Sequence, residues 1–201
     1  MTHHLVLDDI HLLYGSHGTR LNGVCLLEAV AWWAEEEHTD HPACVSPALA
    51  AFGRRLNDIL PDGKRQELVR YIPLMAGTAG DGKDGARVFM AADWAVRTCT
   101  PMWLELADLA AEAAALRALP RVTSIATARK AETEVQKIYT KTRADAAAAA
   151  AAAADAAYAA AYAAYAAAAA AAAYAAADAA ARIRDSAIEL LGRMINPAKK
   201  G

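Results

Sequence analysis

Apolar side chains recur with the period of an amphipathic helix in several stretches of the first 120 residues. One stretch follows Asn22, a candidate N-cap, and places Leu27 and Ala31 on one face. A second begins at Ser46, with Pro47 in the first helical position, where a missing N–H does no harm. Because no stretch shows a convincing strand alternation, the pattern predicts an all-α fold.

The helical series continues to residue 120. Residues 61–75 read as a helix that Pro73 bends or ends. A loop rich in Gly and Asp follows, and a second cap-and-proline start occurs at Thr100. Because Pro120 ends the series, we expect one compact helical domain over residues 1–120.

The rest of the chain, residues 121–201, is dominated by alanine. Neither proline nor glycine interrupts residues 125–191, and alanine has the highest helix propensity of all residues. A continuous helix of about 70 residues would be roughly 100 Å long, which exceeds the diameter of a small domain. We therefore expect a long Ala-rich helix that either projects or folds back as a helical hairpin.

Four tyrosines are the main large side chains of the alanine tract. Tyr158, Tyr162 and Tyr165 fall on one arc of about 80° around the helix. Tyr174 belongs to a second arc, rotated by roughly half a turn. Small side chains let helices approach closely, so these tyrosines are the expected contacts of a self-associating helix or coiled coil. The alternative is a semi-rigid helical spacer.

The end of the chain regains an amphipathic pattern before Asn196 and Pro197 stop the helix. Its apolar anchors are Ile183, Leu190, Leu191, Met194 and Ile195. An amphipathic helix binds through such a stripe, so we expect this segment to dock on a partner or back on the N-terminal domain.

Composition limits the functional classes and the cellular locations that we expect for the protein. The net charge of −2 argues against a nucleic-acid binder, which normally carries a basic stripe. Three cysteines without a scaffold pattern, and no basic-then-apolar leader, indicate a cytoplasmic protein. The alanine tract lacks the Leu, Ile, Val and Phe that drive membrane insertion, so we do not expect a membrane span.

The best candidate for chemistry is the stretch "CLLEAVAWWAEEEHTDHPAC". It contains four potential zinc ligands: Cys25, His38, His41 and Cys44. Thiolate and imidazole are the ligands that tetrahedral zinc prefers, and a water in an open position would suit hydrolysis with Glu28 or Glu37 as base. The alternative is structural, because cysteines also fill small core sites and a histidine at a helix C-terminus favours the helix dipole.

Three other candidate sites lack residues that their known motifs require. "GSHGTR" lacks the lysine and spacing of a phosphate-binding loop, and "GDGKDG" lacks the glutamate that closes a calcium loop. Cys99 has no histidine nearby in the sequence that would activate it as a nucleophile. We therefore expect structural roles for these segments.

Several ordered blocks resemble a known group of sequences. "YGSHG", "LEAVAWWA", "DHPACVSPALAAFGRRLND", "GTAGDGKD" and "AADWAVRTCTPMWLELADL" are similar to a family of uncharacterised helical proteins from actinobacteria and their phages. The resemblance covers approximately residues 14–125. It implies a helical domain trailed by an Ala-rich segment, and for a phage protein it would fit a host-directed interaction, but it implies no reaction.

These observations together predict a non-enzymatic interaction or assembly protein without a cofactor. The N-terminal domain would carry recognition, and the Ala-rich helix would mediate self-association or spacing, with a protein partner or a second copy. The alternative is a zinc-binding protein or zinc-dependent hydrolase centred on His38, His41 and Cys44.

Overall fold

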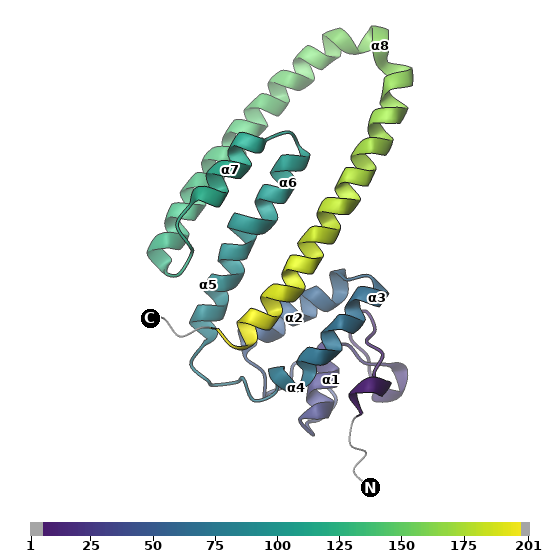
Figure 1. Cartoon of the computed structure of the whole chain (residues 1–201), viewed down its shortest axis with the longest axis vertical. Coiled ribbons are helices and arrows are strands. Elements are labelled where there is room, and N and C mark those ends of the chain that lie inside the picture. The colour runs from purple at the N-terminus through teal and green to yellow at the C-terminus, as the bar shows by residue number, and fades with distance from the viewer. Residues whose placement is uncertain (1–5, 198–201) are drawn as a thin grey trace. The chain divides into compact units, whose positions relative to one another are not determined.

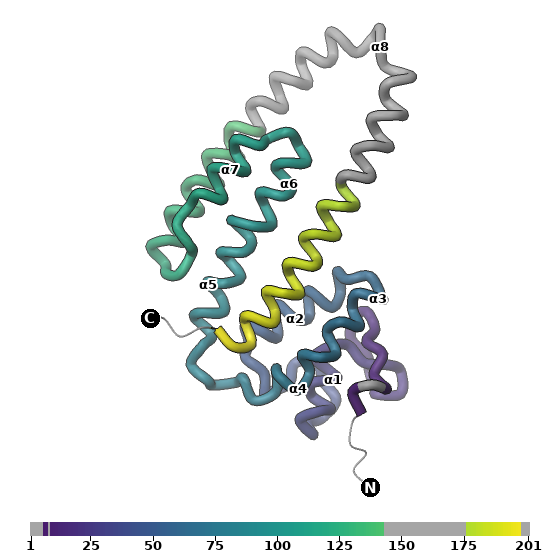
Figure 2. The backbone as a smooth tube through the Cα atoms, viewed as in Figure 1, coloured from purple at the N-terminus to yellow at the C-terminus, as the bar shows by residue number. Residues whose placement is uncertain are grey.

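The chain is helical in the computed structural model shown in Figure 1. The structure describes residues 6–197, apart from the side chains of residues 8 and 143–175. The backbone tube in Figure 2 is grey at the residues whose placement is uncertain. Within the described residues the single β-contact is an isolated bridge between Leu12 and Val24. The predicted all-α class is confirmed.

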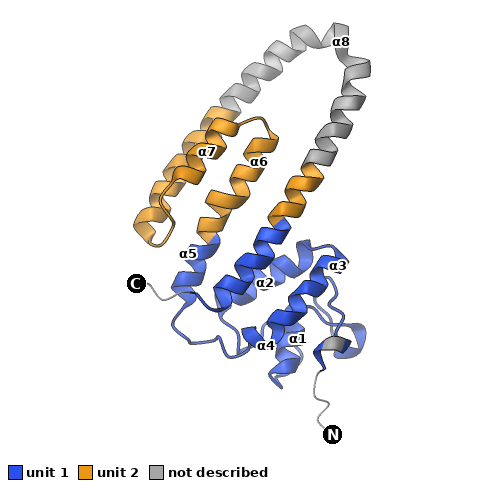
Figure 3. Cartoon of the chain, in the orientation of Figure 1, with its two compact units in different colours: residues 1–91, 184–201 blue, residues 92–183 orange. Residues whose placement is uncertain are grey.

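The chain divides into two compact units, coloured separately in Figure 3. Unit 1 combines residues 1–91 with residues 184–201, and unit 2 comprises residues 92–183. The boundary expected at residue 120 lies inside unit 2, and the division into a compact domain of residues 1–120 and a helical segment of residues 121–201 stays a prediction.

Unit 1 contains short helices joined by turns, together with one end of each of two longer helices. The 3-10 helices are η1 (Leu7–Asp9), η2 (Arg20–Asn22) and η3 (Gln66–Tyr71). The α-helices are α1 (Leu26–Trp33), α2 (Pro47–Ile59), α3 (Asp62–Arg65), α4 (Ile72–Met75), the start of α5 (Asp84–Trp94) and the end of α8 (Ile125–Ile195).

Of the two helix starts predicted near the N-terminus, the structure confirms one and contradicts the other. Helix α2 begins as predicted, because the Ser46 hydroxyl accepts the Leu49 N–H at 3.4 Å and Pro47 occupies the first turn. The prediction of Asn22 as an N-cap is wrong, since α1 begins only at Leu26. Gly23 has a φ of +111°, which no helix can continue through, so Asn22 ends a separate 3-10 turn.

The single helix expected over residues 61–75 is divided into α3, η3 and α4. Pro73 does not end it but lies in the first turn of α4. Proline has no N–H and its ring excludes a carbonyl four residues earlier, so the chain preceding Pro73 tightens into a 3-10 helix. This change of pitch leaves Leu68, Ile72 and Met75 buried on the same core.

Helix α1 is the core element of unit 1. Every residue from 24 to 31 is buried, and α1 packs against both α2 and α4. Gly53 of α2 permits this approach, because a Cβ there would lie 3.3 Å from side-chain carbons of Leu26, Leu27 and Met75. The Asn57 side chain joins the same elements by accepting the Leu26 N–H and donating to the Leu13 carbonyl.

The end of α8 supplies the last layer of this core. Its buried residues within unit 1 are Ala187, Ile188, Leu190, Leu191, Met194 and, beyond the helix, Pro197. Ile195 is half-buried, and Ile188 was not among the predicted anchors. The backbone at Gly192 lies against Tyr71, whose hydroxyl would be 3.0 Å from a Cβ at this position. The part of the predicted apolar stripe that lies in unit 1, from Leu190 to Ile195, therefore faces the helices of this unit.

Unit 2 consists of helical segments from residue 92 to residue 183. It contains the end of α5, the π-helix η4 (Ala95–Cys99), α6 (Thr100–Leu106), α7 (Ala110–Ala118) and α8 as far as residue 183. Thr100 is the first residue of α6 and not the N-cap that the sequence predicted, because Cys99 before it is already helical. The Thr100 hydroxyl donates to the Ala95 carbonyl inside a run that is helical from residue 84 to residue 106. The wider π turn gives room for Pro101, whose ring would otherwise collide with the preceding turn.

We expect Leu191→Ala to lower the free energy of unfolding of unit 1 by about 2–5 kcal/mol, because Leu191 is fully buried and truncation leaves a cavity. Hydrogen exchange at the amides of α1 measures this change within the unit. Glu189→Ala, an exposed position on the same turn, is the matched control and should change it by less than about 0.5 kcal/mol. Equal effects at both positions would contradict the docking of the stripe.

Candidate functional site

Arg87 of α5 is completely buried, and its guanidinium donates hydrogen bonds to several groups of unit 1. Its Nε donates to the Met194 carbonyl at 2.9 Å, and its Nη2 donates to the Ile195 carbonyl at 3.3 Å. The other side of the guanidinium binds the Asp81 carboxylate in a bidentate pair at 2.7 and 2.5 Å. We call Arg87, Asp81 and the carbonyls of Met194 and Ile195 the clasp.

The clasp binds the unpaired carbonyl groups at the C-terminal end of α8. The last carbonyls of an α-helix have no partner inside the helix and carry a partial negative charge, so a cation there is favourable. Arginine offers a planar set of donors that binds a carboxylate and two carbonyls together. The hydrogen bond from Arg87 holds the pKa of Asp81 below its usual value, so this carboxylate is charged at neutral pH and balances the guanidinium.

The loop before α5 positions Asp81. Thr78 fixes its start, since its hydroxyl donates to the Met75 carbonyl at 2.7 Å and accepts the Ser46 N–H at 3.0 Å. Asp81 then accepts the Lys83 N–H at 3.0 Å, and Ser46 donates to Asp84. The "GDGKDG" segment, which fails the calcium pattern, thus holds a carboxylate for an arginine.

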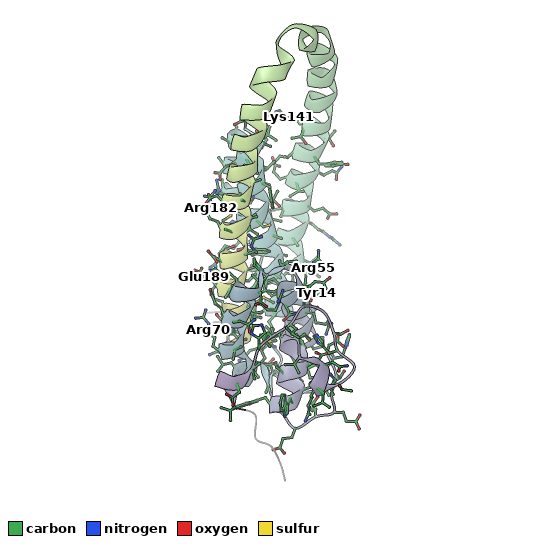
Figure 4. The ribbon with its side chains drawn as sticks, turned by 90° about the vertical axis from the view of Figure 1, so that its right-hand side faces the viewer. Tyr14, Arg55, Arg70, Lys141, Arg182 and Glu189 are labelled. Carbon is green, nitrogen blue, oxygen red and sulfur yellow. The ribbon has the colours of Figure 1, made fainter. Side chains whose placement is uncertain are left out.

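One exposed ion pair and one cation–π contact lie near the apolar part of the docked helix. Lys64 of α3 pairs with Asp185 of α8 at 2.9 Å. The Arg70 guanidinium lies over the Tyr71 ring, 4.9 Å from its centroid, and donates to the Tyr71 hydroxyl. Arg70 and Glu189, two exposed residues of unit 1, are labelled in Figure 4. The site is therefore an apolar surface with a buried cation at the helix terminus and charges along its edge.

A second polar cluster is centred on Glu28 of α1, whose side chain is 1% exposed. Its carboxylate accepts the His17 N–H at 2.5 Å and the Cys25 N–H at 2.7 Å, and lies 2.9 Å from His17 Nδ1. His38 Nε2 lies 3.7 Å from the same carboxylate and 2.8 Å from the His17 carbonyl. Burial alone would raise the pKa of Glu28, but the hydrogen bonds from His17 and Cys25 outweigh it and lower the pKa.

This cluster performs a structural task that the sequence only partly revealed. Glu28 occupies the third position of α1, where it caps the helix start and fastens the loop that contains His17. A glutamate three residues after a cap is the usual signature, but Cys25 is an uncommon cap residue, so the signature is hard to recognise here.

The structure does not assemble the four predicted zinc ligands. Cys25 precedes α1 and burial raises its pKa to about 12, while His38 points to Glu28 and the His17 carbonyl. His41 pairs with Asp40 at 2.5 Å, and burial raises the pKa of Cys44. No group of three or more His, Cys, Asp or Glu side chains could hold a metal ion in the part of the chain that is described. Zinc binding stays a prediction.

The predicted interaction residues of α8 fall into three groups. Leu190, Leu191, Met194 and Ile195 lie in unit 1, and Ile183 is buried in unit 2. Tyr158, Tyr162, Tyr165 and Tyr174 lie outside the residues whose side chains are described. Sequence reasoning missed Arg87, since its helix partners lie more than 100 residues away and a lone arginine in a helix gives no local signal.

Comparison with protein-family models, with curated proteins and with solved structures finds no match to this chain. The resemblance of residues 14–125 to actinobacterial and phage proteins therefore stays a prediction. No helix formed by the described residues is both long and apolar enough to cross a membrane.

We expect Arg87→Met to lower the free energy of unfolding of unit 1 by about 3 kcal/mol, because it keeps the volume and leaves the helix carbonyls and Asp81 without their donor. Chemical denaturation measures the loss. Arg193→Met removes an exposed arginine from the same helix end and should change the stability by less than about 0.5 kcal/mol. Similar losses for both variants would show that overall charge, and not the clasp, matters.

The lowered pKa of Glu28 predicts a contribution to stability that depends on pH. The folded state binds this proton less readily than the unfolded state, so the contribution is fully present above the unfolded pKa of about 4.5 and disappears as the pH falls through the folded pKa. Compared with Glu28→Gln, the wild-type protein should lose stability as the pH falls below about 4.5. Parallel curves for the two proteins over this range would contradict the assignment.

Proposed function

We propose that the protein is a non-enzymatic, cytoplasmic assembly protein. Unit 1 serves as a recognition domain, and α8 serves as a long arm that associates with a protein partner or with a second copy of the chain. This proposal concerns association only, and no cofactor takes part in it.

The observation that carries the proposal is the docking of the α8 end in unit 1. Met194 and Leu191 are buried there, and Arg87 binds the last carbonyls. A helix that only separates two parts of the chain needs no specific contacts at its end. A helix that joins two copies must be bound firmly at its end, so that the association involves the whole protein. Among the described residues, the end of α8 is therefore the best-supported helix-recognition site.

The thiol chemistry supports a non-enzymatic role. Burial raises the pKa of Cys25 to about 12, and burial also raises the pKa values of Cys44 and Cys99. A cysteine nucleophile needs a lowered pKa, because the thiolate is the reactive form. The charged and buried groups of unit 1 are instead used for helix caps and the clasp.

Exposed apolar side chains give unit 1 a surface for recognition. Leu21 in the turn η2 is 98% exposed, and Trp33 at the end of α1 is 39% exposed. The two segments are held together by Arg20, which lies 5.1 Å from the Trp32 ring centroid and donates to the Glu36 carbonyl. A protein partner with an apolar contact surface fits these residues.

Light scattering coupled to size exclusion tests the self-association. The full chain of 21.2 kDa should elute with at least twice this mass. Replacing Tyr158, Tyr162 and Tyr165 by alanine keeps the helix propensity and should raise the dimer dissociation constant at least tenfold, since an aromatic contact contributes about 0.5–1.5 kcal/mol. Tyr14→Ala, an exposed tyrosine of unit 1, is the control. A wild-type monomer at all concentrations would refute self-association.

A further inference from the structure

We propose that two copies of the chain exchange residues 176–197, which we call the C-terminal arm, so that each copy fills the docking site of the other. The proposal rests on the self-association proposed above and specifies which surfaces form it. In the exchanged dimer the clasp and the apolar stripe are the same contacts as in one chain, but they join two copies. Exchange of an identical element creates an interface without any new surface chemistry.

The first reason lies within unit 2, where both described parts of α8 approach the same pair of helices. Lys141 pairs with Glu112 of α7 at 2.7 Å. Glu105 of α6 accepts a bidentate pair from Arg117, which is the main cause of its lowered pKa, and the charge of Arg182 lowers it further. Ala179 and Ile183, beside Arg182 on α8, are buried and belong to the same unit as α6 and α7, which pack on each other. Both described parts of α8 therefore belong to one compact set of helices.

One straight helix cannot satisfy both contacts within one chain. Lys141 and Arg182 are 41 residues apart, which corresponds to roughly 60 Å along an α-helix. Helices α6 and α7 have 7 and 9 residues, so each is only about 10–14 Å long. Either the helix reverses its direction between these residues, or the arm comes from another copy.

The sequence between the contacts opposes a reversal. Sharp helix kinks occur almost always at proline, at glycine or serine, or at a π turn. Residues 142–181 contain no proline, glycine or serine, and alanine favours continuation of the helix more than any other residue. Exchange lets the tract remain straight while both arms keep their docking contacts.

Exchange also defines the register of the two α8 helices. Two straight α8 helices that exchange arms run antiparallel, and their twofold axis would lie midway between Lys141 and Arg182, next to Tyr162. Position 158 follows Lys141 by 17 residues and position 165 precedes Arg182 by 17 residues, so position 158 of one helix would be level with position 165 of the other. The alanines between them permit the close approach of two helices.

A zero-length carbodiimide cross-link on the unmodified full chain tests the exchange. Lys64 and Asp185 are 2.9 Å apart, half exposed, and belong to the docking site and the arm respectively. Equal amounts of ¹⁴N- and ¹⁵N-labelled chains are unfolded, refolded together and cross-linked, and the linked peptides are identified by mass spectrometry. If the arms are exchanged, about half of the Lys64–Asp185 links should join a light peptide to a heavy one, as random pairing requires.

The Lys141–Glu112 pair is the internal control, because both residues precede the alanine tract and should be linked within one chain in either arrangement. Mixed isotopes in the Lys64–Asp185 link alone would support exchange. A dimer whose Lys64–Asp185 links all carry one isotope would overturn exchange and leave self-association intact. A monomer with such links would overturn both.

A pair of insertions after Ala160 provides a second test that does not depend on cross-linking. Seven residues of glycine and asparagine would let the chain reverse, so the protein should shift from dimer to monomer with at least a tenfold higher dissociation constant. Seven alanines, about two helical turns, preserve the straight helix and should leave the dimer intact. A dimer that tolerates the glycine insertion as well as the alanine insertion would overturn the proposal.

Discussion

The organisation of unit 1 depends on the hydrogen bonds of one buried group, the guanidinium of Arg87. A buried cation is unfavourable unless it is paired and hydrogen-bonded, and its partners come from two distant parts of the chain. Asp81 supplies the counter-charge, and Met194 and Ile195 supply the helix carbonyls. The 3.5 Å bond to the Thr78 carbonyl is the weakest of the set. Without the end of α8, two of the five N–H donors of Arg87 would lose their acceptors, which explains why unit 1 is discontinuous in sequence.

A second buried arginine shows that this device is used more than once. Arg65 donates from Nε to the Asn57 carbonyl at 2.8 Å and from Nη2 to the Leu60 carbonyl at 2.7 Å, and so satisfies the end of α2. In both cases the capping side chain comes from a different helix, which joins two elements while it removes unpaired carbonyls. Short helices such as α3 and α4 have little intrinsic stability, so contacts of this kind largely determine where they lie.

The sequence predicted features whose signals are local. The start of α2 was correct because a Ser46 hydroxyl, Pro47 and an apolar stripe all act within one turn. Asn22 and Thr100 failed as caps because Gly23 and the π turn before Pro101 override the local preference. The clasp could not be predicted, since Arg87 and Met194 meet only after the fold brings them together. The histidines and cysteines of residues 25–44 looked like a ligand set because spacing shows which groups are near in the chain, but not which atoms they face.

The alanine tract of α8 and the C-terminal end of α8 differ in composition, and they contribute differently to docking. Alanine gives helix propensity without large buried area, so the tract can determine length and direction but not where the helix docks. Docking is determined by Leu190, Leu191 and Met194, which are buried while their neighbours Glu189 and Arg193 are exposed. Each residue added to a continuous helix rotates the remainder of that helix by 100°, so a single extra alanine would turn the stripe away from its site while a length change of whole turns would preserve it. A tract of this composition therefore leaves the individual residues free to vary, but its length is constrained by the helical repeat wherever both ends are held.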